Sequence, residues 1–251
     1  MTQAATEGII RLGEVKPGMQ VLDVATGVGD PAIALAKLVR PDGHVLAVDM
    51  VNEMVKAGEE EARQQGVSNI SFEQANAESL PFSSQSFDLV TCKHAVMIFA
   101  DVKAGLREIR RVLETGRRAI FTAHGLPEEN PWRSCIERVF SKYLEVAPSV
   151  PGTPHAYRFA HPGTLSEALK EAGFSLVEEE SPTLPWIWHG TPEEFWEYRR
   201  NQGAQFLRLI GRLAPEQRDD VIAEVLDSIR EYSTGSELNF TAQIVLASAV
   251  R

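Results

Sequence analysis

The chain has few cysteines, no long apolar run and no excess of positive charge. Cys92 and Cys135 are too few and too far apart in sequence for a disulfide framework or a cysteine-based metal site, so we expect reduced thiols and a cytoplasmic location. With 35 acidic and 25 basic side chains the formal net charge is −10. Because a net negative charge repels phosphate backbones, we do not expect nucleic acid as a partner.

Segments that target or anchor a protein are also missing. Residues 1–8 lack a basic region followed by an apolar segment, and no apolar run approaches the roughly 20 residues that cross a bilayer. The remaining composition, 43% hydrophobic and 24% charged, is that of a globular protein with a substantial core. We expect one elaborated domain without a membrane span.

Tryptophan and tyrosine are absent from the first 130 residues. Large rings that carry one polar atom often line pockets for organic ligands, but they also pack helices together, and both alternatives stay open for each ring. All eight lie in the second half of the chain, at Trp132, Tyr143, Tyr157, Trp186, Trp188, Trp196, Tyr198 and Tyr232.

Short apolar runs alternate with helical patterns between residues 20 and 122, which is typical of βαβ units around a parallel sheet. We predict strands at 20–24, 45–49, 70–74, 87–92 and 118–122, and helices at 31–39, 52–65 and 102–113. Right-handed crossovers arrange such units into a doubly wound, Rossmann-like α/β sheet.

The second half predicts further elements and an insertion. We expect helices at 163–172, 192–200 and 215–232, and strands at 174–180 and 238–247. The predicted division is a core at 1–129, followed by residues 130–251, which complete the sheet and supply helical lid insertions at 130–162 and 182–237. An insertion of this size covers a site or pairs with a partner subunit, so a homodimer is one expectation.

Two segments carry the chemistry of the first half. Residues 21–30 read VLDVATGVGD, and residues 44–49 read HVLAVD. A buried strand that runs into a glycine-bearing turn at a helix start, with an acid at the tip of the next strand, is the geometry that holds a nucleoside. The sequence therefore predicts a site for an adenosine-like cofactor.

The glycine turn departs from the pattern that binds NAD. That pattern needs three glycines in the order G-x-G-x-x-G, whereas the corresponding residues here are Ala25, Gly27 and Asp30. A carboxylate at the helix start repels a pyrophosphate. A cofactor without phosphate and with a cationic amino-acid end fits better, and Asp49 can accept from its two ribose hydroxyls.

These motifs resemble class I S-adenosylmethionine-dependent methyltransferases. They are most similar to the small-molecule branch that includes the ubiquinone/menaquinone C-methyltransferases, and the resemblance is good over residues 9–121. It implies a seven-stranded sheet whose last strand is antiparallel. It also implies S-adenosylmethionine as the cofactor and S-adenosylhomocysteine as its product.

The resemblance further implies which residues meet the cofactor. Asp49 stands where relatives bind the ribose, Met50 follows against the adenine, and Asn76 begins the adenine-binding loop after the third strand. The backbone near Lys93 meets the amino-acid end. Cofactor contacts are expected at Asp23, Ala25, Thr26, Gly27, Gly29, Asp49, Met50, Asn76, Ala77, Glu78 and Lys93.

Other family patterns are absent. Residues 114–117 read ETGR where relatives commonly carry Lys-Pro-Gly-Gly, and Met97-Ile98 replace a frequent pair of histidines. The motif of the quinone enzymes is replaced by KHAVM at 93–97, which counts against a quinone acceptor. An Asn/Asp-Pro-Pro-Tyr signature is also missing, which counts against adenine and glutamine as acceptors.

Methyl transfer requires alignment of the acceptor and, for a hydroxyl or carbon acid, removal of a proton. His94 and His124 follow two successive strands and are the candidate catalytic bases, although each could simply cap its strand. No cluster of residues suggests a metal site. Acceptor contacts are expected at Met97, Trp132, Tyr157, Trp186 and Trp188.

The leading hypothesis is a methyltransferase that acts on an oxygen or carbon of an apolar or aromatic small molecule. Two alternatives remain open. One is a methyltransferase-like enzyme that keeps the cofactor as a scaffold for a rearrangement or cyclisation, and the other is a non-catalytic partner subunit with the same fold. A partner subunit would not need the acid at Asp49 or the amide at Asn76.

Overall fold

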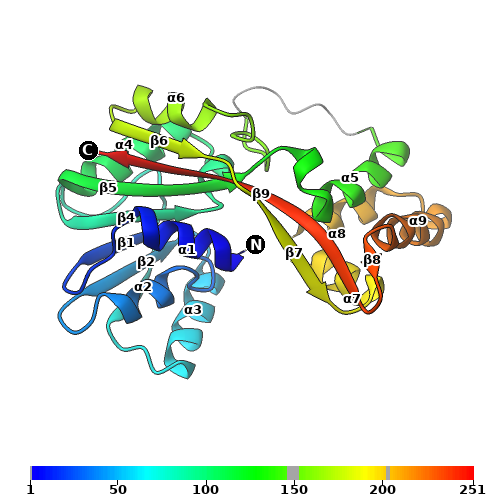
Figure 1. The fold of residues 1–251 in the computed structure, drawn as a ribbon, viewed down its shortest axis with the longest axis horizontal. Coiled ribbons are helices and arrows are strands. Elements are labelled where there is room, and N and C mark those ends of the chain that lie inside the picture. Colours follow the sequence, from blue (N-terminus) through cyan, green and yellow to red (C-terminus); the bar gives the residue numbers. More distant parts are fainter. Residues whose placement is uncertain (1, 146–152, 202–203) are drawn as a thin grey trace. The chain divides into compact units, whose positions relative to one another are not determined.

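A computed structural model describes residues 2–145, 153–201 and 204–251 (Figure 1). These residues form two compact units. The first, which we call the sheet unit, contains residues 2–124, the described part of 151–182, and 244–251. The second, the helical unit, contains the described part of 125–150 and of 183–243. Residues 146–152 and 202–203, which belong to the two predicted insertions, lie outside the described residues.

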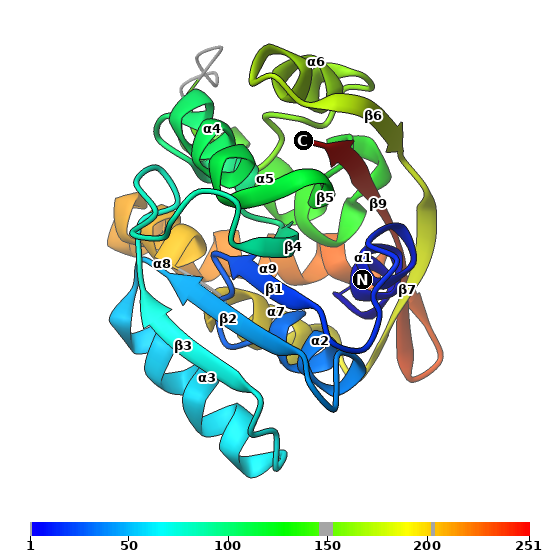
Figure 2. The same ribbon diagram turned by 90° about the vertical axis from the view of Figure 1, so that its left-hand side faces the viewer.

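The sheet unit is built on seven strands in the order β3-β2-β1-β4-β5-β9-β6, which follow one another across Figure 2. The first five along the chain are mutually parallel, and β9 is antiparallel to both β5 and β6. The predicted doubly wound sheet with an antiparallel last strand is therefore confirmed. The strands are β1 Gln20–Val24, β2 His44–Asp49, β3 Ile70–Gln74, β4 Phe87–Lys93, β5 Leu113–His124, β6 Ser175–Glu180 and β9 Glu237–Val250.

Helices cover both faces of this sheet, because successive side chains along a buried strand point to opposite faces. Val21 and Val45 pack with the buried sides of α1 (Thr2–Leu12), α2 (Ala32–Leu38) and α3 (Asn52–Gln64). Leu22 and Val24 pack with α4 (Val102–Val112) and α6 (Thr164–Glu171) on the other face. Because β1 to β5 are parallel, their carboxyl ends lie at one edge of the sheet.

The strand order reverses between β1 and β4, which continue in opposite directions across the sheet. In open α/β sheets, ligands bind outside the carboxyl ends of the strands at such a switch point. Asp23 lies there, opposite Thr91 of β4 and Ala47 of β2. The fold thus places the residues that follow β1, β2 and β4 at one edge.

The helical unit combines helices with a short antiparallel sheet. Its helices are α5 Pro131–Tyr143, α7 Pro192–Asn201, α8 Ala204–Arg212 and α9 Arg218–Arg230. Strand β7 (Thr183–His189) pairs with the first half of β9, from Thr183 opposite Gln243 to His189 opposite Glu237, and β8 (Ser233–Thr234) pairs beside it. Strand β9 therefore contributes to both units.

Several elements differ from those expected from the sequence. Residues 183–189, inside a stretch predicted as a helical insertion, form β7, because Leu184, Trp186 and Trp188 alternate toward the interior of the unit. Residues 215–217 form a separate 3-10 turn before α9, so the predicted helix at 215–232 is shorter. Helix α1 was not predicted, since its sequence carries no capping signal.

Candidate functional site

The side chain of Asp23 is fully buried at the switch point between β1 and β4. Its Oδ1 atom accepts a hydrogen bond of 2.5 Å from the Thr91 hydroxyl, and its Oδ2 atom has no partner among the described residues. Burial raises the pKa of Asp23 to about 6, although the nearby hydroxyls of Thr26 and Thr91 and the positive charge of Lys93 oppose the shift. A buried carboxylate oxygen without a partner is suited to a cation that arrives with a ligand.

The turn after β1 has an unusual backbone. Ala25, Gly27 and Gly29 have φ angles of +57°, +58° and +98°, a region that glycine enters at little cost. A Cβ at Gly29 would press on Ile33 at 2.8 Å, whereas a Cβ at Gly27 would meet no heavy atom of the described residues within 4 Å, its chain neighbours aside. The φ angle of Gly29 thus favours glycine there, and Gly27 leaves its outer face open to a ligand.

Asp49, at the end of β2, holds this turn in place. Its Oδ2 atom accepts a hydrogen bond from the Gly27 amide and its Oδ1 atom accepts one from the Val51 amide, both of 2.9 Å. Each carboxylate oxygen keeps a further lone pair, so the group can accept from two neighbouring hydroxyls at once. The next side chain, Met50, is 66% exposed and offers an apolar surface beside it.

The loop after β3 is shaped by its own polar side chains. The Asn76 Oδ1 atom accepts a hydrogen bond of 3.0 Å from the Glu78 amide. The Glu78 Oε1 atom in turn accepts from the amides of Ala100 and Asp101, at 2.8 and 3.1 Å. Glu78 therefore joins this loop to the turn before α4, and Ala77 is buried between them. In this arrangement Glu78 is a positioning residue.

Lys93 is the last residue of β4, and its side chain is only 6% exposed. It forms an ion pair with Asp30 and donates a hydrogen bond of 2.9 Å to the Thr6 hydroxyl. Thr6, on α1, donates in turn to Asp30 Oδ1 at 2.7 Å. Burial lowers the pKa of Lys93, and the Asp30 carboxylate opposes that shift. Three segments of the chain thus meet at the lysine ammonium.

His94 and His124 lie together after β4 and at the end of β5. Their rings stack with centroids 4.7 Å apart and planes inclined by 16°. His94 has a φ of +50°, and its amide donates to the carbonyl and hydroxyl oxygens of Thr122. Both ring nitrogens of His94 are shielded from solvent. Burial and the nearby Lys93 charge lower the pKa of His94 to about 3, so its imidazole is neutral at physiological pH.

Two predicted acceptor contacts lie in the same unit. Met97 follows the histidine turn and is buried, and its carbonyl oxygen accepts a hydrogen bond of 3.3 Å from the His155 amide. The Nδ1 atom of His155 accepts from the Tyr157 amide, also at 3.3 Å. The 155–157 segment is therefore fixed against the turn that carries His94 and Met97.

Comparison with known proteins connects this geometry to a family. A family model described as "Methyltransferase domain" matches residues 15–170. The ubiquinone/menaquinone biosynthesis C-methyltransferase UbiE of Shewanella oneidensis is 32% identical over 184 residues, which are 69% of this chain and 73% of UbiE. The chain belongs to the S-adenosylmethionine-dependent methyltransferases. This confirms the family and the cofactor that the motifs predict.

Other known proteins are also similar to this chain. The uncharacterized methyltransferase YcgJ of Bacillus subtilis is 37% identical over 121 residues, which span 48% of this chain and about half (47%) of YcgJ. Its crystal structure superposes with a TM-score of 0.66 at 21% identity and covers 99% of this chain and 98% of YcgJ. The [4+2]-cyclase SpnF superposes with a TM-score of 0.63 at 20% identity, over 98% of this chain and 80% of SpnF. At these identities the superpositions show a shared fold.

The other predicted acceptor contacts, Trp132, Trp186 and Trp188, lie in the helical unit, where aromatic rings pack against one another. Trp132 is 1% exposed, and its Nε1 atom donates to Asn130 Oδ1 at 2.9 Å. Its ring meets that of Trp186 edge to face, with centroids 5.1 Å apart, and Trp188 packs in the same way on Phe195. These rings form the core of the unit, and their contact with an acceptor stays a prediction.

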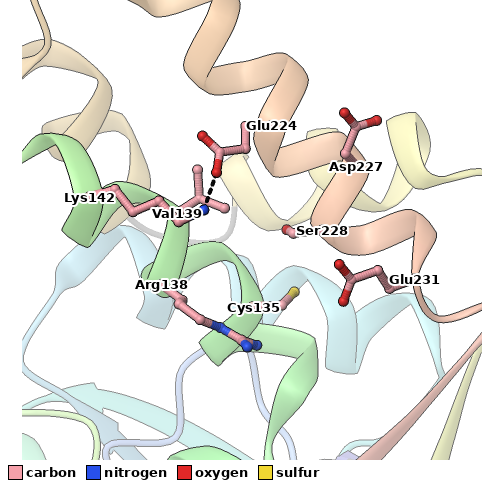
Figure 3. A pocket seen from close by; sticks show the side chains of 8 residues that line it. All are labelled: Cys135, Arg138, Val139, Lys142, Glu224, Asp227, Ser228 and Glu231. Carbon is pink, nitrogen blue, oxygen red and sulfur yellow. Dashed lines mark hydrogen bonds and ion pairs between the residues drawn. The ribbon is translucent and has the colours of Figure 1, made fainter.

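A cavity of about 160 Å³ lies between α5 and α9 of the helical unit (Figure 3). On its charged rim, Lys142 is bonded to Glu224. Cys135 lies in its wall, and burial raises the pKa of that thiol to about 11, which leaves it unreactive at neutral pH. We assign no chemistry to this cavity.

The described residues give no sign of a metal centre or a membrane helix. Nowhere in the described chain do three or more His, Cys, Asp or Glu side chains come together as ligands for an ion. None of the described helices has the length and apolar character required to cross a bilayer.

Sequence reasoning missed three hydroxyl residues of the site. Thr6 lies in an unpredicted helix, and Thr91 and Thr122 lie inside strands where they read as ordinary β-branched core residues. Thr91 and Thr122 are fully buried and bond to Asp23 and to the His94 amide. For Thr91 and Thr122, the sequence signal was a threonine near the end of a buried parallel strand.

Proposed function

We propose that this methyltransferase binds S-adenosylmethionine across the ends of β1, β2 and β4 and moves its methyl group to an oxygen or carbon of an apolar or aromatic small molecule. The observation that carries the proposal is the pair of acids beside the open turn. Asp49 is fixed by two backbone amides with lone pairs to spare, and Asp23 is buried with one oxygen unpartnered. Between them, Gly27 leaves room for a ligand to cross the turn.

The strand order sets the direction of the cofactor. Asp49 on β2 would accept from the ribose hydroxyls, so the adenine would extend toward β3, where Asn76 and the exposed Met50 lie. The amino-acid end would then extend the other way, over the ends of β1 and β4. Asp23, the last residue but one of β1, and Lys93, the last residue of β4, offer charges of both signs for a zwitterion.

Bound S-adenosylmethionine supplies a sulfonium methyl group that is already activated for in-line displacement. The protein must align the acceptor atom at about 3 Å and keep water out, which is a task of proximity. In this proposal His94 and His124 would orient an acceptor by hydrogen bonding. Since His94 is neutral, it can accept a hydrogen bond from a hydroxyl or donate one to an oxyanion.

The acceptor class follows from the residues near the histidines. Met97 is buried and Ile98, the next residue, is 59% exposed, so the turn after β4 presents an apolar surface. The relative UbiE named above is a C-methyltransferase of ubiquinone/menaquinone biosynthesis. A small apolar or aromatic acceptor is therefore the class that we propose.

Cofactor binding tests the first half of the proposal. Isothermal titration of the wild type should detect S-adenosylmethionine and S-adenosylhomocysteine, and Asp49→Ala should abolish both signals because the ribose loses its acceptor. Asp42→Ala, in the exposed turn between α2 and β2, is the matched control and should bind as the wild type does. Absence of binding by the wild type would overturn the proposal.

Acceptor screening tests the second half. Purified enzyme with S-adenosylmethionine and a panel of phenols, enols and apolar carboxylic acids should release S-adenosylhomocysteine with at least one of them. Conversion of an acceptor without release of S-adenosylhomocysteine would identify a scaffold enzyme, and binding without any conversion across the panel would favour a partner subunit. Either result would overturn the proposed methyl transfer.

A further inference from the structure

The Lys93 ammonium is held in a small polar cluster that the proposed function leaves unexplained. Its described partners are the Asp30 carboxylate and the Thr6 hydroxyl. Thr6 is 8% exposed and bridges the two charges, since its hydroxyl donates to Asp30 and accepts from Lys93. Burial of a lysine ammonium to this degree costs free energy of desolvation. Its presence therefore indicates a role for the charge that a shorter apolar residue could not fill.

The bonding of this ammonium is incomplete. An ammonium carries three N–H bonds, and Asp30 and Thr6 take two of them, so one remains for a ligand. Asp30 is itself 48% exposed, so the cluster borders solvent on the side of the glycine turn. A ligand would therefore approach the remaining N–H beside Asp30.

The surrounding charges restrict what this ligand can be. Asp23 and Asp30 are both close enough to Lys93 to affect its pKa, so the group holds two carboxylates and one ammonium. A free phosphate or a second anion would meet net negative charge there. A zwitterion fits, with its carboxylate on Lys93 and its ammonium toward the unpartnered oxygen of Asp23.

We propose that Lys93 binds the α-carboxylate of S-adenosylmethionine, and that Asp30 and Thr6 are positioning residues that hold the lysine ammonium for it. This inference rests on the cofactor site proposed above. It assigns a side-chain contact to a residue whose backbone alone is expected at the cofactor, and it gives α1 an indirect part in cofactor binding through Thr6. The charges also match. Asp23, Asp30 and Lys93 together carry one net negative charge, which the sulfonium of the cofactor balances.

Three ligands that differ only at the amino-acid end test the assignment. S-adenosylhomocysteine carries the ammonium and the carboxylate, S-adenosyl-3-thiopropylamine lacks the carboxylate, and 5′-methylthioadenosine lacks both. Titrations are made at pH 8, well above the pKa of about 6 of Asp23, because removal of the Lys93 charge raises that pKa further. Lys93→Met should lower affinity for S-adenosylhomocysteine by about tenfold or more, as expected for a lost charge-assisted bond. Affinity for the other two ligands should change by less than about threefold.

Matched variants separate recognition from folding. Lys103→Met removes an exposed lysine that pairs with Glu171 and should leave all three affinities unchanged. Thr6→Val should lower affinity for S-adenosylhomocysteine alone, by part of the loss seen in Lys93→Met. Thr6→Ser keeps the hydroxyl and should bind S-adenosylhomocysteine as the wild type does. Because Asp30 is half exposed, Lys93→Met leaves no buried unpaired charge at that residue, and Thr6→Val gives a second test if this variant does not fold.

The outcomes distinguish the inference from the proposed function. Equal loss of all three ligands in Lys93→Met would mean that the lysine only supports the fold, and no loss of any would mean that it does not touch the cofactor. Either result would overturn the carboxylate assignment while the cofactor site stands. Failure of the wild-type protein to bind any of the three would overturn the cofactor site itself.

Discussion

The Asp49 carboxylate accepts a hydrogen bond of 2.9 Å from the backbone amide of Gly27. The acid at the end of β2 thereby fixes the turn that follows β1, although 22 residues separate the two in sequence. Because the same carboxylate also accepts from Val51, its position is set before a ligand arrives. We expect the turn to be preformed in the absence of cofactor.

Gly27→Ala should abolish cofactor binding without unfolding the protein. A methyl group at this residue meets no described atom but projects into the face that the cofactor would cross, and the φ of +58° costs about 1 kcal/mol for alanine. Gly66→Ala is the matched control, since Gly66 has a φ of +65° and equally open surroundings in an exposed turn. Thermal denaturation should show similar small losses for both variants, and titration should show lost binding for Gly27→Ala alone.

Asp23→Asn should stabilise the protein without cofactor while it impairs cofactor binding. Burial raises the pKa of Asp23 from 3.8 to about 6, which corresponds to about 3 kcal/mol against the charged form. The folded state therefore binds the proton more tightly than the unfolded state, and this residue lowers the free energy of unfolding as pH rises from about 4 to about 6. Urea denaturation at pH 8 should show a gain of up to about 3 kcal/mol for Asp23→Asn. A loss of stability would contradict the prediction.

The preference for S-adenosylmethionine over S-adenosylhomocysteine should decline in mild acid. The two ligands differ by the positive charge of the sulfonium, which the ionised Asp23 carboxylate attracts. As pH falls through about 6, Asp23 gains a proton and this attraction is lost, while Lys93 and Asp30 contribute equally to both ligands. The ratio of the two Kd values, measured by titration from pH 5 to pH 8, should therefore vary with pH in the wild type. In Asp23→Asn that variation should be absent.

His94→Asn should lower turnover on an identified acceptor by about tenfold or more while cofactor affinity is unchanged. Asparagine tolerates the φ of +50° and keeps a hydrogen-bonding group, so the turn itself should persist. His161→Gln, in an exposed loop, is the control and should have no effect. Because the pKa of His94 is about 3, the wild-type kcat/KM should show no His94 titration between pH 5 and pH 8. Undiminished turnover in His94→Asn would remove this residue from the mechanism.

Much of the sheet unit could be predicted because its signals are local. Each βαβ unit is a run of apolar residues, a turn and an amphipathic helix, all within about 30 residues. Asp23, Gly27 and Asp49 could be placed together for the same reason, since the carboxyl ends of neighbouring parallel strands meet at one edge. Strand β7 could not be predicted in this way, because its pairing with β9 joins residues 183 and 243.

The sequence by itself determined the order of the parallel strands' motifs, the open glycine turn and the acids that flank it, because these depend on the chain's local pattern. The tertiary structure alone decided the chemical state of those groups. Thr6 reaches Lys93 across 87 residues, and burial by distant segments raises the pKa of Asp23 and lowers that of His94. Desolvation depends on every segment that surrounds a group, so no pattern along the chain could reveal it.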